Sequence, residues 1–209
     1  MLAKLKQQIQ ALMSYQAQLA YQIGLTPNLV SALGILTAIA SAFLYWSSQF
    51  YSLNLVAASL FLLISGFFDA LDGVIARLYG KVTVFGGFLD SMLDRYADAL
   101  VLAGIILGFF ITDPFGLFWG LLALIGSLLV SYSRARAEAA GVKMETIGLA
   151  ERAERIIILV IASLVTLIWS DALWWSLVLL AVLTNLTVLQ RAVYFRKASR
   201  KKEAATPIV

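Results

Sequence analysis

Cysteine and histidine are both absent from this 209-residue sequence. The lack of cysteine excludes disulfides, thiolate metal ligands and a cysteine nucleophile, and the lack of histidine excludes imidazole ligands and a histidine general base. Any bound metal ion must then be held by oxygen atoms, which favours a hard cation such as Mg²⁺, Mn²⁺ or Ca²⁺. Metal binding and acid–base chemistry therefore fall to the carboxylates.

Charged residues are also scarce, at 13%, whereas 61% of the residues are hydrophobic and the mean hydropathy is +0.88. Soluble domains average about 45–50% apolar and about 25% charged residues, so this composition is typical of a polytopic membrane protein. Six apolar stretches have the roughly 20 residues needed to cross a ~30 Å hydrocarbon core. They cover residues 29–48, 53–77, 85–110, 116–135, 148–169 and 173–195.

The two ends of the chain differ from this apolar region. Residues 1–24 lack the continuous apolar core of a signal peptide. Apolar residues recur there at helical spacing, which favours an amphipathic helix on the membrane surface; a soluble helix packed on loops is the alternative. We therefore predict an all-α integral membrane protein with a surface helix (1–24), a domain of six transmembrane helices (25–197) and a basic tail (198–209).

The basic residues indicate an orientation. With six spans, all 16 lysines and arginines fall on one side of the membrane, and the opposite loops carry only Asp113 and Asp171 as charged residues. Basic residues concentrate on the cytoplasmic side of membrane proteins, so both termini are predicted to be cytoplasmic. Five or seven spans would mix the two sets, so the pattern also supports the number six.

Four aspartates, Asp69, Asp72, Asp90 and Asp94, lie near the cytoplasmic ends of the second and third predicted spans. Their spacings of three and four place each pair on one face of its helix. The short connection makes the two helices adjacent and antiparallel, which brings the four carboxylates together. Acids in a poorly hydrated site must be protonated or neutralised by a cation, and a divalent metal ion is the natural partner. A surface loop with four ordinary acids is the alternative.

Small residues and an arginine accompany these acids. Gly73, Ala76 and Gly86 leave room either for close helix packing or for a ligand that approaches the backbone. Arg77, at the end of the second span, is placed to hold an anionic group or one of the aspartates. Carboxylates, a divalent cation and an arginine at a membrane–water boundary suggest phosphate chemistry on a lipid head group.

Together these residues form a pattern that resembles the signature of the CDP-alcohol phosphotransferases. All eight positions are filled, as Asp69-x2-Asp72-Gly73-x2-Ala76-Arg77-x8-Gly86-x3-Asp90-x3-Asp94. The six-span length and the tripeptide Thr26-Pro27-Asn28 before the first span also fit. The resemblance implies that an acceptor hydroxyl attacks the lipid-linked phosphorus of CDP-diacylglycerol or CDP-archaeol and releases CMP. It also implies a membrane-embedded homodimer with its active site on the cytoplasmic side.

The resemblance further implies a role for each position. The ligands of Mg²⁺ or Mn²⁺, as one ion or two, would be Asp69, Asp72 and Asp90. Asp94 would contribute to the metal site and act as the general base toward the acceptor hydroxyl. The CDP-lipid pocket would be lined by Asp69, Gly73, Ala76, Arg77 and Gly86. Asp98 lies outside the signature, and we interpret it as a partner for Arg95 or another cation.

Arginines at cytoplasmic helix ends suggest a phosphate site close to the aspartates. They are Arg134, Arg136, Arg152, Arg155 and Arg191. Guanidinium groups hold phosphate through paired hydrogen bonds, which favours a phosphorylated polyol over a neutral alcohol as the acceptor; plain membrane topology is the alternative explanation. The surrounding sequences SYSRARAE, ERAER and QR resemble the inositol phosphate branch of the family, the phosphatidyl- or archaetidylinositol phosphate synthases. This resemblance implies inositol 1-phosphate. The phosphatidyl enzymes are expected to have lysine at position 134, so glycerol 3-phosphate stays open as the acceptor.

Two other classes of protein remain to be weighed. A cation or proton transporter also uses carboxylates within the membrane, but it is expected to place them near the midplane, often on broken helices. A non-catalytic scaffold has no need of four acids at this spacing. No nucleic-acid site is indicated, because topology and acceptor binding account for the basic residues.

Overall fold

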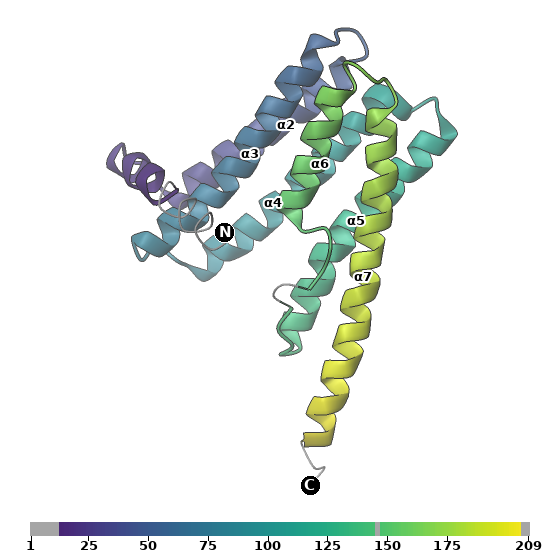
Figure 1. The fold of residues 1–209 in the computed structure, drawn as a ribbon. Helices are drawn as coiled ribbons and strands as arrows, with labels where there is room; N and C mark the ends of the chain where they lie inside the picture. The colour runs from purple at the N-terminus through teal and green to yellow at the C-terminus, as the bar shows by residue number, and fades with distance from the viewer. Residues whose placement is uncertain (1–12, 145–146, 206–209) are drawn as a thin grey trace, which may run out of the picture.

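The structure is a computed structural model and describes residues 13–144 and 147–205. The described part is helical and forms an antiparallel bundle, with no strands among these residues (Figure 1). The elements after the N-terminal segment are α2 (Pro27–Ser47), α3 (Leu53–Leu78), α4 (Val84–Ile105), the π-helical turn η1 (Ile106–Phe110), α5 (Pro114–Ala139), α6 (Arg152–Val165) and α7 (Ala172–Ala205).

Local sequence signals start several of these helices. Thr26, Thr83 and Asp113 each occupy an N-cap position, and their side-chain oxygens accept hydrogen bonds from Leu29 N, Gly86 N and Phe115 N, respectively. A proline follows in the first turn of α2 and of α5, where its missing N–H costs no hydrogen bond. These caps fix the starts of the three helices to within a residue or two of the predicted spans.

The six predicted spans correspond to six helical segments, but four of them are long and apolar enough to cross a membrane by length and composition. These are α2, α3, α5 and residues Ala172–Arg200 of α7. Helix α4 carries four charged residues, Asp90, Asp94, Arg95 and Asp98, and α6 has only 14 residues. The span expected over 148–169 is thus shortened at both ends. Before α6, Gly148 has φ 141°, and Leu149 N donates to Thr187 Oγ1 over 3.0 Å, which binds the preceding loop to α7.

The chain ends differ from the prediction in extent. Residues 13–22 are helical, and Tyr21 stacks on Tyr79 at the end of α3 with ring centroids 3.7 Å apart. Residues 1–12 lie outside the described residues, so the surface helix is described only over its second half. At the other end, α7 continues past residue 198, where we expected the tail to begin, as far as Ala205.

The helices pack through small and polar residues as well as apolar ones. Ser41 Oγ donates to Ala58 O over 2.8 Å, and Tyr45 and Ser163 share a buried hydrogen bond of 2.8 Å. A Cβ on Gly104 would collide with the backbone of Ala42 in α2, so only glycine permits this approach of α4. Many large apolar side chains stay exposed on the outer faces of the bundle, which suits contact with lipid.

Candidate active site

Four aspartates face one another where the second half of α3 meets the first half of α4, beside α2. Asp69, Asp72, Asp90 and Asp94 all line one cavity of about 10 Å³, which we name the carboxylate cavity. Its remaining walls are Ser31, Gly34, Ile35 and Leu93. The three- and four-residue spacings therefore do turn each pair toward the same space, as the sequence predicted.

The geometry of the carboxylate cavity suits a hard cation. One carboxylate oxygen from each of Asp69, Asp90 and Asp94 lies within 4.8 Å of the other two. Oxygen-only donors in this number match Mg²⁺, Mn²⁺ or Ca²⁺ and do not match a metal that prefers sulfur or nitrogen. Asp72 is 5% exposed and stands slightly apart, because its Oδ2 accepts a short hydrogen bond from Ser31 Oγ in α2.

Arg152, in the first turn of α6, reaches these carboxylates from the other side. Its Nη1 lies 2.6 Å from Asp69 Oδ1 and also contacts Asp94 Oδ1, while its Nε lies 3.3 Å from Asp98 Oδ1. A positive charge in the first turn of a helix opposes the helix dipole, so the three carboxylates compensate for an unfavourable position. Arg152 thus neutralises part of the acidic cluster.

Asp98 pairs with arginines of α6 rather than with its neighbour Arg95. Asp98 Oδ2 lies 2.5 Å from Arg155 Nη2, and Arg155 Nη1 donates to Ala150 O over 3.1 Å. Arg95 instead donates to Ser91 O over 2.6 Å and lies 3.5 Å from Asp94 Oδ2. The interpretation of Asp98 as a partner for a cation is confirmed, and the cations are Arg152 and Arg155.

A pocket of about 300 Å³ opens beside the carboxylate cavity, and we name it the glycine pocket. It is lined by Pro27, Asn28, Ser31, Asp72, Gly73, Ala76, Arg77, Lys81, Val82, Thr83, Gly86, Gly87 and Asp90. A Cβ on Gly73 would lie 3.2 Å from Arg77 Nη1, and one on Gly86 would lie 2.8 Å from Thr83 Oγ1. The structure therefore brings together four of the five residues expected around the CDP-lipid; Asp69 lies in the carboxylate cavity instead.

A second pocket, of about 340 Å³, opens on the side of Asp69 and Asp94, and we name it the arginine pocket. Four of the five arginines expected to bind acceptor phosphate line it, namely Arg134, Arg152, Arg155 and Arg191. Arg136 does not, and it lines a different, largely apolar pocket that includes Tyr132 and Phe195. The reason is helical geometry: residues two apart on α5 point to nearly opposite faces, so Arg134 and Arg136 cannot share a pocket.

The arginines of the arginine pocket differ in how far they are already engaged. Arg191 is 2% exposed, and it donates to Val130 O and Ile147 O over 2.5 and 2.8 Å. Arg134 is more exposed and donates to Glu138 Oε1 over 2.9 Å, one turn along α5. Arg191 therefore ties α7 to α5 and to the loop before α6, whereas Arg134 is held only by an exposed pair that a ligand can displace.

Several pocket residues had no assigned role in the sequence. Asn28, Lys81 and Thr83 line the glycine pocket, and Ser131 lines the arginine pocket. Ser31 lines both the glycine pocket and the carboxylate cavity and donates to Asp72. The sequence did contain a signal for Ser31: it lies one helical turn after Pro27, so the two residues share one face of α2.

Comparison with known proteins decides the family. The model of the CDP-alcohol phosphatidyltransferase family matches residues 24–187, which include the carboxylate cavity and all four of its aspartates. The chain belongs to this family. The match covers most of the helical bundle and ends within α7.

Two archaeal relatives within the family are similar in sequence. The chain is 40% identical to an archaetidylinositol phosphate synthase of Pyrococcus horikoshii over 199 residues, which is 94% of this chain and 97% of the relative. It is 43% identical to an archaetidylinositol phosphate synthase of Methanothermobacter thermautotrophicus over 106 residues, 49% of this chain and 50% of the relative.

Solved structures of the phosphatidylinositol phosphate synthase of Mycobacterium tuberculosis are similar in fold. One holds CDP-DAG and matches with a TM-score of 0.77 at 32% identity, over 88% of this chain and 92% of that one. Another, in complex with manganese and citrate, matches with the same TM-score and identity over 88% of each chain.

Proposed function

We propose that this chain is a metal-dependent transferase that moves the phosphatidyl or archaetidyl group of a CDP-lipid to inositol 1-phosphate and releases CMP. One observation carries the proposal: the carboxylate cavity joins the two pockets. Asp72 and Asp90 open onto the glycine pocket, while Asp69 and Asp94 open onto the arginine pocket. A donor in one pocket and an acceptor in the other would meet at the carboxylates. The family membership and the synthases named above support the same reaction.

Asp69, Asp72, Asp90 and Asp94 would hold the divalent cation, as one ion or two. When bound, Mg²⁺ or Mn²⁺ would offset negative charge on the diphosphate of the donor. The oxygen donors fit either ion. Ser31 would orient the Asp72 carboxylate through its hydrogen bond, as residues behind a metal ligand commonly do.

In the transfer step, the acceptor hydroxyl oxygen would bond to the lipid-bearing phosphorus as the bond from that phosphorus to the CMP oxygen breaks. Asp94 would accept the hydroxyl proton, because it lines both the carboxylate cavity and the arginine pocket. CMP then leaves with the electron pair of the broken bond.

The two pockets would sort the substrates. Gly73, Ala76 and Gly86 would let the cytidine diphosphate lie close to the backbone, and Arg77 would pair with its phosphate. In the arginine pocket, Arg134, Arg152, Arg155 and Arg191 would bind the phosphate of the acceptor. Four guanidinium groups at one pocket favour an acceptor that carries its own phosphate over inositol or serine.

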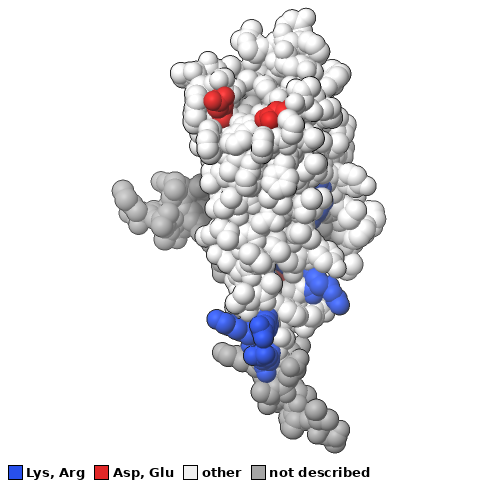
Figure 2. All heavy atoms as spheres, turned by 90° about the vertical axis from the view of Figure 1, so that its right-hand side faces the viewer, with Lys and Arg blue, Asp and Glu red and all other residues white. Residues whose placement is uncertain are grey.

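Six helical segments, including α4 and α6, would cross or enter the membrane, with both termini and the active site on the cytoplasmic side. The charge distribution supports this orientation: on the face in Figure 2, the prominent acidic residues lie near one end of the bundle and most of the basic residues lie toward the other. The family resemblance supports a homodimer, and the lipid is either the diacyl or the archaeal ether form.

The experiment is CMP release by the purified protein in detergent or vesicles. CDP-diacylglycerol and CDP-archaeol are each supplied with Mg²⁺ or Mn²⁺, and inositol 1-phosphate, glycerol 3-phosphate, inositol and serine are offered separately. We expect release with inositol 1-phosphate and its loss in EDTA. Release only with glycerol 3-phosphate would keep the mechanism and change the acceptor. No release in any combination would return the transporter as the better explanation.

A further inference from the structure

The proposed function gives Arg152 two tasks that conflict. Its guanidinium would bind the acceptor phosphate in the arginine pocket, yet in the structure Nη1 contacts Asp69 and Asp94, which would ligate the cation. A guanidinium and a divalent cation repel each other and seek the same carboxylates. Both can be accommodated only if Arg152 has another anchor when the cation is bound.

Asp98 has the properties of that anchor. It contacts Arg152 Nε, but it does not line the carboxylate cavity and does not belong to the group of oxygens that could share a cation. Its other oxygen is held by Arg155 at 2.5 Å, and Arg155 is itself 5% exposed and fixed to Ala150 O. Asp98 therefore keeps its position whether or not Arg152 stays on Asp69 and Asp94.

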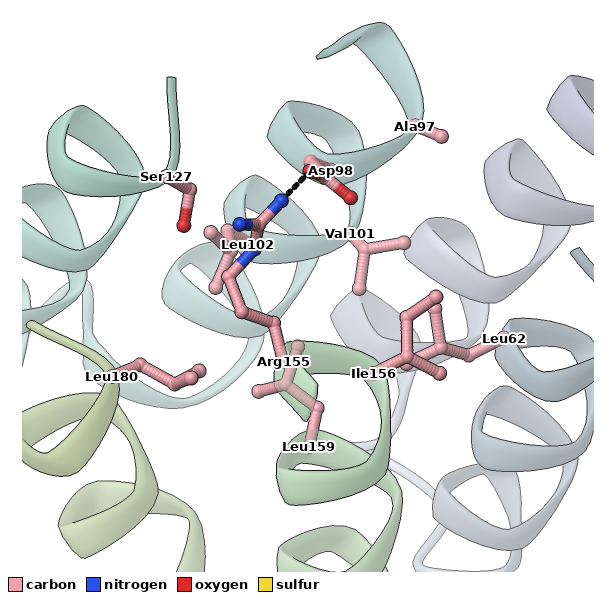
Figure 3. Close-up of a pocket in the computed structure, with 10 residues that line it drawn as sticks. All are labelled: Leu62, Ala97, Asp98, Val101, Leu102, Ser127, Arg155, Ile156, Leu159 and Leu180. Carbon is pink, nitrogen blue, oxygen red and sulfur yellow. Dashed lines mark hydrogen bonds and ion pairs between the residues drawn. The ribbon is translucent and has the colours of Figure 1, made fainter. Parts of the chain in front are cut away.

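Apolar side chains enclose the Asp98–Arg155 pair on one side. Figure 3 shows Arg155 extending from α6 to meet Asp98 on α4; both line a cavity whose walls also include the apolar side chains of Leu62, Val101 and Leu159. The cavity is only about 20 Å³ in volume, so Arg155 has little room to move on that side, while its other side faces the arginine pocket. Apolar walls also strengthen the attraction between the two charges.

We propose that Asp98 is a positioning residue that retains Arg152 beside the arginine pocket when a divalent cation takes Asp69 and Asp94. This inference rests on the proposed function. Arg152 then exchanges between two settings: on the carboxylates of the cavity, or held through Nε by Asp98 with both Nη groups turned to the acceptor phosphate. Cation and acceptor binding thereby favour each other, and by linkage each raises the affinity of the other by the same factor.

The first test measures Mn²⁺ alone, by the electron paramagnetic resonance of free Mn²⁺, without donor or acceptor. Arg152→Gln removes the competitor, so we expect Mn²⁺ to bind about tenfold more tightly, about 1.4 kcal/mol. The matched control is Arg134→Gln, which removes the same charge from the same pocket but from a residue paired with Glu138. We expect a change within about twofold for the control. Equal changes in the two variants would show a general field effect and overturn the exchange.

The second test is a mutant cycle that removes Asp98 together with its partner Arg155. Asp98→Asn alone would leave Arg155 buried without its carboxylate, so it is combined with Arg155→Gln, which removes both partners and leaves the net charge unchanged. With Arg152 present, this pair of changes should weaken Mn²⁺ binding about fivefold, because Arg152 then rests only on Asp69 and Asp94. In the Arg152→Gln background it should change Mn²⁺ binding by less than about twofold. The same weakening in both backgrounds would overturn the role of Asp98.

A third measurement tests the linkage itself. Inositol 1-phosphate should tighten Mn²⁺ binding to the unmodified protein severalfold and should have no such effect on Arg152→Gln. Since these tests need neither CDP-lipid nor turnover, their failure is distinct from that of the proposed reaction. If Mn²⁺ binding follows the cycle but no CMP is released, the exchange stands and the proposed function fails.

Discussion

The glycine pocket and the arginine pocket meet at the same carboxylates but are built in different ways. The glycine pocket is formed by two helices joined by a short loop, together with the start of α2, and most of its chemistry comes from one continuous sequence signature. The arginine pocket draws on α3, α4, α5, α6 and α7, and its arginines come from positions as far apart as Arg134 and Arg191. Within one family, the first pocket would therefore be the constant part and the second the part that selects the acceptor.

The largest expected effect comes from the carboxylates that both pockets share. Asp94→Asn should lower CMP release about 10²- to 10⁴-fold with every acceptor, because the variant cannot take the hydroxyl proton. Initial rates at saturating donor and acceptor give the measurement. Asp113→Asn is the matched control, since asparagine is also a good N-cap and Asp113 lies at the other end of the bundle, at the start of α5. Comparable loss in the control would point to misfolding.

The next effect should separate the two pockets. Arg134→Gln should raise the KM for inositol 1-phosphate about 10- to 100-fold, because a hydrogen bond to a charged group contributes about 1.5–3 kcal/mol. The KM for CDP-lipid should stay the same. Arg136→Gln makes the same chemical change two residues away, on the opposite face of α5, and should alter neither KM by more than about twofold. If Arg136→Gln had the larger effect on the acceptor, the arginine pocket would be wrongly assigned.

Ser31 tests the layer behind the metal ligands. Ser31→Ala should weaken Mn²⁺ binding about tenfold, since residues that orient a ligand contribute about 10–100-fold to metal affinity. Titration of activity against Mn²⁺ concentration provides the measurement. Ser31→Thr retains the hydroxyl and should recover most of the affinity. An unchanged titration for Ser31→Ala would remove Asp72 from the metal site.

The smallest expected effect is at Gly86 in the wall of the glycine pocket. A Cβ at Gly86 would lie 2.8 Å from Thr83 Oγ1 and displace the side chain that caps α4. Gly86→Ala should therefore lower the stability by about 1 kcal/mol, the usual contribution of an N-cap, and raise the KM for CDP-lipid severalfold. Thermal unfolding and donor titration measure the two effects, and the KM for the acceptor serves as the internal control. A raised acceptor KM alone would contradict the division between the pockets.

The two pockets also differ in how well the sequence predicted them. Asp69, Asp72, Asp90 and Asp94 could be brought together because they lie on two helices joined by a short loop, so helical periodicity alone sets their faces. Arg136 was grouped with the other arginines because it lies near a helix end, and its face on α5 was not considered; the structure places it in a different pocket. The same periodicity would have separated it from Arg134.

Other features depended on contacts between distant segments, which periodicity does not carry. The insertion of Arg152 between Asp69 and Asp94 requires the start of α6 to lie beside α3 and α4. Gly148 and the hydrogen bond from Leu149 to Thr187 in α7 keep residues 148–151 out of the helix. Hydropathy does not register these contacts, so the predicted span began before the true start of α6. Arg191 donates to two carbonyl oxygens of segments that are distant in sequence, so its structural role likewise could not be predicted from the residues around it.

The close approach of α4 to α2 has a consequence for the chemistry. Gly104 contacts the backbone of Ala42, and Gly108, in the π-helical turn, contacts the backbone of Tyr45. Gly104 lies ten residues after Asp94, or about 15 Å along the helix axis. The position of α4, and of the aspartates on it, thus depends on this close backbone contact with α2. A methyl group at Gly104 would force α4 and α2 apart, so a substitution far from any substrate would be expected to disturb the helix that carries Asp90 and Asp94.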